Sequence, residues 1–128
     1  MQSNAIHFTN QKNHNIHLYV CKDYDTISKK AAGLVSGMVN VKPDCILGLA
    51  TGSSPIGMYE KLAELYRDGI TDYSKVTTFN LDEYCALPED NDQSYHYFMR
   101  EHLFAHINVP AENIHIPSGC AQDVETEC

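Results

Sequence analysis

The stretch that decides the fold is Cys45-Ile46-Leu47-Gly48-Leu49-Ala50-Thr51-Gly52-Ser53-Ser54-Pro55, an apolar run that passes directly into a small polar turn. Its apolar part, residues 45–50, predicts a strand that is buried on both faces, as strands of parallel sheets are. Its polar part predicts the beginning of a helix, because Ser54 is a favourable N-cap and Pro55 suits the first helical position. The order of strand, turn and helix indicates an α/β fold.

Helical periodicity flanks this stretch on both sides. Upstream of it, Asp25 suits an N-cap, and one apolar helix face follows: Ile27, Ala31, Leu34, Val35 and Met38. Downstream of it, a second face precedes the stop signal Gly69 and comprises Tyr59, Leu62, Ala63 and Tyr66. A third face is expected at Tyr95, Phe98, Met99, Leu103 and His106. These spacings are typical of amphipathic helices.

Three more segments, residues 16–21, 76–81 and 114–116, predict strands, and Asp123 suits the beginning of a last helix. Strands and helices that alternate in this way imply right-handed crossovers between parallel strands. We therefore expect a three-layer α/β/α fold with a mostly parallel, Rossmann-like sheet.

The composition of the 128 residues is that of a folded domain. Hydrophobic residues make up 43% of the chain and charged residues 20%, which predicts a packed core rather than disorder. We expect residues 16–128 to belong to one domain. Residues 1–15 are expected to be a tag remnant and a flexible N-terminus.

The charge balance argues against two classes of partner. Nine Lys and Arg stand against seventeen Asp and Glu, a net charge of −8, whereas nucleic acids and anionic membranes attract basic surfaces. No apolar run is long enough for a transmembrane helix. Five cysteines without a CxxC pair favour a reducing, cytoplasmic setting. The expected partner is therefore a small molecule.

The polar turn suits the binding of a phosphate monoester. The first N–H groups of a helix lack internal partners and carry the positive end of the helix dipole. Gly52 lets a ligand approach the backbone, and Thr51, Ser53 and Ser54 offer hydroxyl groups. The spacing matches neither a Walker A loop nor GxGxxG, which disfavours a dinucleotide. The alternative interpretation is an ordinary capped turn.

Asp82, Glu83 and Tyr84 follow the strand expected at residues 76–81, at the sheet edge where ligands bind in such folds. A carboxylate there is a candidate general base, and the alternative is a solvated or helix-capping group. Successive side chains of a strand point to opposite faces, so one carboxylate faces the ligand while the other serves the scaffold. The pattern does not choose between Asp82 and Glu83.

His102 and His106 are spaced i, i+4 on an expected helix, next to Glu101. The HExxH order is absent and no third ligand is evident, so zinc binding is disfavoured. We expect a partly buried histidine pair and no metal.

Three segments together resemble the first half of glucosamine-6-phosphate deaminase. They are residues 47–55 (LGLATGSSP), residues 80–84 (NLDEY) and residues 94–99 (SYHYFM). The resemblance extends from about Ile16 to Cys128, with the segments in the expected order. The related 6-phosphogluconolactonases share the turn but differ at the acidic segment.

The resemblance implies a cofactor-free hydrolase of amino-sugar metabolism that isomerises glucosamine 6-phosphate and releases fructose 6-phosphate and ammonia. It implies that Asp82 is the base that moves a proton from C2 to C1, and that Tyr84 lies near the sugar. The implied phosphate-binding residues are Thr51, Gly52, Ser53 and Ser54.

The family's ring-opening motif and its later basic residues do not occur before Cys128. The resemblance therefore implies that residues 16–128 are the N-terminal part of a single sugar-phosphate isomerase/deaminase domain. We expect this truncated domain to have little or no deaminase activity of its own. Its exposed apolar surface predicts self-association, so a homo-oligomer is possible. The alternatives are a non-catalytic sugar-phosphate binding module and a 6-phosphogluconolactonase-like hydrolase.

Overall fold

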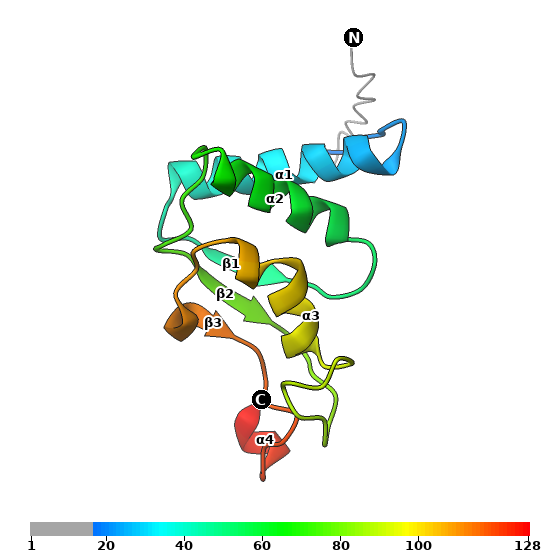
Figure 1. Ribbon diagram of the computed structural model, residues 1–128, viewed down its shortest axis with the longest axis vertical. Helices are drawn as coiled ribbons and strands as arrows, with labels where there is room; N and C mark the ends of the chain where they lie inside the picture. Colours follow the sequence, from blue (N-terminus) through cyan, green and yellow to red (C-terminus); the bar gives the residue numbers. More distant parts are fainter. Residues whose placement is uncertain (1–16) are drawn as a thin grey trace, which may run out of the picture.

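The computed structural model describes residues 17–128, so the expected tag remnant at residues 1–15 lies outside the described residues, as does Ile16. In chain order the elements are α1 (Tyr24–Val41), β1 (Ile46–Leu49), α2 (Ile56–Arg67), β2 (Thr77–Asn80), α3 (Tyr95–His102), η1 (Phe104–His106), η2 (Ala111–Asn113), β3 (Ile114–His115) and α4 (Val124–Glu127). Figure 1 shows α1 and α2 side by side, with the strands running together below them.

The three strands form one parallel sheet in the order β1-β2-β3. Gly48 of β1 lies opposite Phe79 of β2, which in turn lies opposite His115 of β3. This pairing confirms the parallel α/β fold class and three of the four expected strands. Because the strands are parallel, the segments that follow β1 and β2 begin at the same edge of the sheet.

Side chains from all three long helices share one core with the sheet. The core residues are Ala32, Val39, Cys45, Leu49, Tyr59, Leu62, Tyr73, Val76, Met99 and Leu103. On the other side of the sheet, Ile46 is 69% exposed and Phe79 is 43% exposed. The expected burial of residues 45–50 on both faces is therefore wrong within residues 17–128, where the helices pack on one face.

Two expectations at the beginning of the described chain are wrong. The N-cap of α1 is Asp23, whose carboxylate accepts a hydrogen bond from the first helical turn at 2.8 Å, and not Asp25. Residues 17–21 form no strand, and the sheet of the described residues consists of β1, β2 and β3. The Tyr19 ring lies instead against α1, with the Lys30 ammonium 4.4 Å from its centroid.

Helix α1 buries a different face from the one that its apolar residues predict. The buried positions are Ser28, Ala32, Ser36 and Val39, whereas three residues of the expected face, Ile27, Leu34 and Met38, are exposed. Small side chains face α2 because the two helices approach closely. A Cβ on Gly57 of α2 would clash with the Ser28 side chain. Close packing, rather than apolar content, selects the buried face.

The remaining helices follow the sequence more closely. Helix α2 buries Tyr59 and Leu62 as expected and ends before Gly69, which has a φ of 71°. Helix α3 buries Met99, and α4 begins directly after its N-cap Asp123.

The histidine pair does not share a helix. Helix α3 ends at His102, whose ring packs against Phe98 with centroids 4.5 Å apart. His106 lies in η1 and is exposed, and its Nε2 lies 2.8 Å from the Glu101 carbonyl oxygen. Each ring therefore has its own local partner.

Candidate active site

Two segments follow strands at the same edge of the sheet, and we call residues 51–55 the 51–55 turn and residues 82–86 the 82–86 loop. The strand ends that carry them are tied together. The side-chain amide of Asn80 is buried at the end of β2 and donates to the Leu49 carbonyl of β1 at 3.1 Å. The convergence expected from the sequence thus rests on direct strand pairing.

The 51–55 turn presents its backbone and hydroxyl groups to solvent. Gly52 has a φ of 97°, a left-handed conformation that glycine adopts without steric cost. Gly52, Ser53 and Ser54 are exposed, and Thr51 is half-buried. An anion can therefore reach the backbone of this turn.

The first turn of α2 is capped from another helix. Its cap residue is Pro55, which makes no side-chain cap hydrogen bond, so the expected cap role of Ser54 is wrong. The Gly57 N–H donates instead to the Tyr24 hydroxyl of α1 at 2.9 Å. That hydroxyl also lies 3.0 Å from the carbonyl oxygens of Ser53 and Ser54. One tyrosine from α1 thereby fixes the middle of the turn.

A second tyrosine fixes the entry to the turn. Tyr59 is fully buried, and its hydroxyl donates to the Ala50 carbonyl at 2.5 Å and accepts from the Ala50 N–H at 3.1 Å. Burial raises the pKa of the Tyr59 hydroxyl, which keeps it protonated as a donor. The backbone that enters the turn is therefore held on both its N–H and its C=O.

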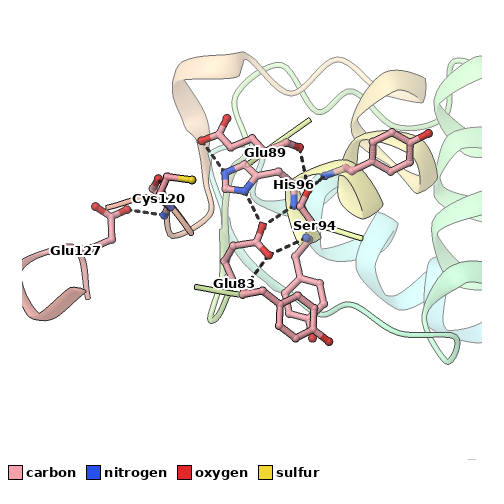
Figure 2. Close-up of polar contacts among 10 residues, drawn as sticks. Glu83, Glu89, Ser94, His96, Cys120 and Glu127 are labelled. Atoms are coloured by element: carbon pink, nitrogen blue, oxygen red, sulfur yellow. Dashed lines mark hydrogen bonds and ion pairs between the residues drawn. The ribbon is translucent and has the colours of Figure 1, made fainter. Parts of the chain in front are cut away.

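The two neighbouring carboxylates occupy different environments. Asp82 is exposed, whereas the Glu83 side chain is 2% exposed. Figure 2 shows Glu83 pointing toward the beginning of α3, where it accepts hydrogen bonds from the main chain of Tyr84, Tyr95 and His96 and from the His96 ring. Glu83 is therefore the scaffold carboxylate, and Asp82 is the one that faces solvent.

The hydrogen bonds keep Glu83 ionised in spite of its burial. Burial raises the pKa of the Glu83 carboxyl, but the donors on Tyr95, His96 and Tyr84 outweigh that effect and lower the pKa overall. An ionised carboxylate is an acceptor only, as this set of four donors requires.

Tyr95 joins the turn to the loop, and the sequence analysis missed this role. Its ring lies 4.9 Å from that of Tyr84, centroid to centroid. The pKa of the Tyr95 hydroxyl is raised by its hydrogen bond with Tyr84, then by burial, and further by the Asp82 charge, whereas a hydrogen bond with Thr51 lowers it. Tyr95 directly follows Ser94, the N-cap of α3. This position at the beginning of a helix is the feature of the sequence that could have pointed to Tyr95.

Three properties of the described chain bear on ligand class. No group of three or more His, Cys, Asp and Glu side chains within residues 17–128 is arranged to hold a metal ion. All five cysteines are free thiols. No helix in the same part of the chain has both the length and the apolar character needed to cross a membrane.

The chain matches a family of known proteins over most of its length. Residues 24–128 match the family described as glucosamine-6-phosphate isomerases/6-phosphogluconolactonase. A glucosamine-6-phosphate deaminase of Clostridioides difficile (strain 630) is 58% identical over 109 residues, which are 85% of this chain and 44% of the relative. A protein of the same name from Halothermothrix orenii is 58% identical over 107 residues, which are 84% of this chain and 44% of the relative.

Solved structures share the fold. A monomeric glucosamine-6-phosphate deaminase superimposes with a TM-score of 0.81 at 40% identity, over 84% of this chain and 45% of that protein. A 6-phosphogluconolactonase of Thermotoga maritima superimposes with a TM-score of 0.68 at 26% identity, over 86% of this chain and 49% of that protein. The chain thus spans less than half the length of these relatives.

Proposed function

The chain belongs to the glucosamine-6-phosphate isomerase/6-phosphogluconolactonase family, and we propose that the natural protein converts glucosamine 6-phosphate into fructose 6-phosphate and ammonia. One observation carries the proposal: an anion-accessible turn and the exposed carboxylate of Asp82 follow two paired strands, whose ends are joined by the hydrogen bond from Asn80 to the Leu49 carbonyl. The deaminase relatives support the choice of substrate.

In this proposal the 51–55 turn binds the phosphate group. The exposed backbone of this turn and the positive end of the α2 dipole favour an anion there. The hydroxyls of Thr51, Ser53 and Ser54 and the open backbone of Gly52 add donors and access. Binding energy from the phosphate, which is remote from the reacting carbons, then fixes C1 and C2 of the sugar near the loop.

Asp82 is the proposed base. It takes the proton from C2 of the open-chain amino sugar and returns it at C1, and Tyr84 lies beside the sugar. O1 gains a proton while the amine loses one, so the transfer leaves a hydroxymethyl group at C1 and C2 double-bonded to nitrogen. Water then adds at C2 and ammonia leaves, so one water is consumed for each ammonia released and no electrons are exchanged. A base held within hydrogen-bond reach makes this weakly acidic proton removable.

The deaminase relatives do not support the expected assignment of the protein as a hydrolase. The family description names isomerases beside a lactonase, and simple hydrolysis belongs to the lactonase relatives. We therefore propose an isomerising deaminase of amino-sugar metabolism.

Two other candidates have an observation in their favour. A 6-phosphogluconolactonase shares the fold, and its substrate carries a terminal phosphate that would suit the same turn. The other candidate is a sugar-phosphate binding module without turnover, because the exposed 51–55 turn could bind a phosphate without any catalytic group.

Turnover of two phosphosugars separates these candidates. The complete natural protein is incubated with glucosamine 6-phosphate, and ammonia and fructose 6-phosphate are measured, while hydrolysis of 6-phosphogluconolactone is followed in parallel. Equal release of ammonia and fructose 6-phosphate supports the proposal. Lactone hydrolysis alone, or phosphosugar binding without turnover, would contradict it.

We further propose a cytoplasmic location and self-association of the 128-residue chain. Free thiols at all five cysteines are typical of reducing compartments. Exposed apolar side chains such as Leu34, Ile46 and Leu81 favour association. A monomer at all concentrations in analytical ultracentrifugation would contradict the second part.

A further inference from the structure

A single buried carboxylate accepts hydrogen bonds from the backbone of three residues in or next to the candidate site. Glu83 Oε1 accepts from the Tyr84 N–H at 2.8 Å and from the Tyr95 N–H at 3.0 Å. Glu83 Oε2 accepts from the His96 N–H at 3.1 Å and from His96 Nδ1 at 2.9 Å (Figure 2). Both oxygens are occupied by donors of the protein itself.

Water cannot easily replace these contacts. The Glu83 side chain is 2% exposed, and its negative charge lies at the beginning of α3, where the helix dipole is positive. The His96 side chain, which is 18% exposed, lies between two carboxylates. Its Nδ1 contacts the buried Glu83, and its Nε2 lies 3.4 Å from the carboxylate of Glu89, whose side chain is 64% exposed. Loss of a charge-assisted, buried acceptor leaves several donors unsatisfied at once.

The other side of the loop is fixed as well. The Ala86 N–H donates to the Gly119 carbonyl at 2.6 Å. A Cβ on Gly119 would clash with the carbonyl oxygens of Tyr84 and Leu87. With Gly119 on one side and Glu83 bound to α3 on the other, the loop has little freedom to adjust when one contact is lost.

From this geometry we infer that Glu83, braced by His96, is a positioning residue that sets the Tyr84–Tyr95 pair, and through it the sugar end of the substrate site. The inference rests on the proposed function and deepens it. Glu83 does not contact substrate, because its oxygens are buried and in use. It fixes the backbone of two tyrosines whose rings pack at 4.9 Å beside Asp82.

Different residues hold the parts of the site that bind the two ends of the substrate. The phosphate end is bound by the 51–55 turn, which Tyr24 and Tyr59 hold without help from Glu83. Damage to Glu83 therefore affects the sugar end directly, whereas the backbone of the turn, which Tyr24 and Tyr59 hold, keeps its geometry. General loss of folding would instead lower the amount of active protein and leave KM unchanged.

The test is Glu83→Gln in the complete natural protein. The amide keeps the size of the side chain, but its NH₂ group faces N–H donors where an acceptor is needed. We measure kcat and KM for glucosamine 6-phosphate and the inhibition constant of inorganic phosphate. We expect kcat/KM to fall roughly 10- to 100-fold with KM raised, as for a misplaced substrate contact. The inhibition constant of phosphate stays at the parental value.

Two further variants complete the design. Glu89→Gln removes an equal charge from the exposed side of His96 and is expected to leave the parental constants unchanged. His96→Phe keeps a ring but removes the donor to Glu83, so it is expected to raise KM less than Glu83→Gln. His96→Phe decides the question by the same criteria where Glu83→Gln does not fold.

Parental kinetics in Glu83→Gln and His96→Phe would overturn the inference. So would a fall in kcat that disappears when rates are normalised to folded protein, or a phosphate inhibition constant that rises together with KM. If the parent protein releases no ammonia, the proposed function fails by itself. The inference is then read from dissociation constants of glucosamine 6-phosphate and of phosphate, with the same expected contrast.

Discussion

The 51–55 turn and the 82–86 loop lie at the same sheet edge but are held in different ways. Neutral tyrosine hydroxyls from α1 and α2 hold the turn through its backbone. A buried, ionised carboxylate at the beginning of α3 holds the loop. The turn is thus fixed by hydroxyl groups, whereas the loop depends on one charged side chain.

The difference also assigns different chemistry to the two segments. The turn offers donors and an open backbone, which suit a group that is bound and does not react. The loop presents an exposed carboxylate on a rigid backbone, which suits proton transfer. Changes in the turn should therefore alter binding, and changes in the loop should alter turnover.

The largest effect is expected from Asp82→Asn in the complete natural protein. The amide cannot accept the C2 proton, so kcat should fall by about 10² to 10⁴, the usual contribution of a general base. KM and the inhibition constant of phosphate should stay near parental values, because the turn is untouched.

Asp90→Asn, an exposed carboxylate beyond the loop, is the matched control and should retain parental kcat. A kcat in Asp82→Asn within a few-fold of the parent would show that another group is the base. The 82–86 loop would then not be the segment that carries out proton transfer.

Tyr24→Phe tests whether the 51–55 turn serves binding rather than turnover. The change removes the hydroxyl that accepts from Gly57 and contacts the Ser53 and Ser54 carbonyls. About 1 kcal/mol of support is lost, which corresponds to roughly a fivefold weaker phosphate affinity. Isothermal titration with inorganic phosphate measures it, and kcat should be unchanged.

Tyr66→Phe supplies the control for Tyr24→Phe, since Tyr66 packs on the Tyr73 ring with centroids 6.4 Å apart, away from the turn. Equal losses of phosphate affinity in both variants would mean that the hydroxyl of Tyr24 has no special role. A loss of kcat in Tyr24→Phe would mean that turn and loop are coupled.

The sequence predicted the turn well because its determinants are adjacent in the chain. An apolar run, a glycine and a proline in succession leave few conformations open, and the strand, the turn and the following helix appeared where expected. The N-terminal cap of α2 was predicted wrongly. The Gly57 N–H donates to the hydroxyl of Tyr24, which is remote from Gly57 in the sequence. A local pattern cannot report a partner supplied by another helix.

The loop was predicted less well for the same reason. Alternation indicated that Asp82 and Glu83 differ, but the choice between them depends on α3 and His96, which no spacing reveals. Helix α1 is a related case: its apolar residues marked one face, and close approach to Gly57 selected the other. Residues 17–21 read as a strand, yet a strand exists only where a neighbour pairs with it.

We also expect the stability of the protein to depend on pH through Glu83 of the 82–86 loop. The pKa of Glu83 is lower in the folded protein than its ordinary value of 4.5. Its stabilisation is therefore fully present above pH 4.5 and is lost as the pH falls through the folded pKa. The difference in melting temperature between the parent and Glu83→Gln should shrink as the solution is acidified below pH 4.5.

Thermal melts of both proteins from pH 3 to pH 7 measure this difference. The carboxylates of Asp23, Asp25 and Asp72, whose pKa values are also lowered, contribute equally to both proteins and cancel. A difference in melting temperature that is constant over this range, or that grows on acidification, would contradict the role of the Glu83 charge.

The smallest effect is expected from Ala86→Gly, which compares the left-handed residues of the two segments. The turn places glycine at a φ of 97°, whereas the loop places Ala86 at a φ of 61°, at a cost of about 1 kcal/mol for a residue with a Cβ. Glycine removes that cost but adds a similar entropy to the unfolded chain. The melting temperature should therefore rise by no more than a few degrees, or stay unchanged. A clear fall would mean that the Ala86 methyl group makes contacts that outweigh its backbone strain, and that packing holds the loop beside the Glu83 charge.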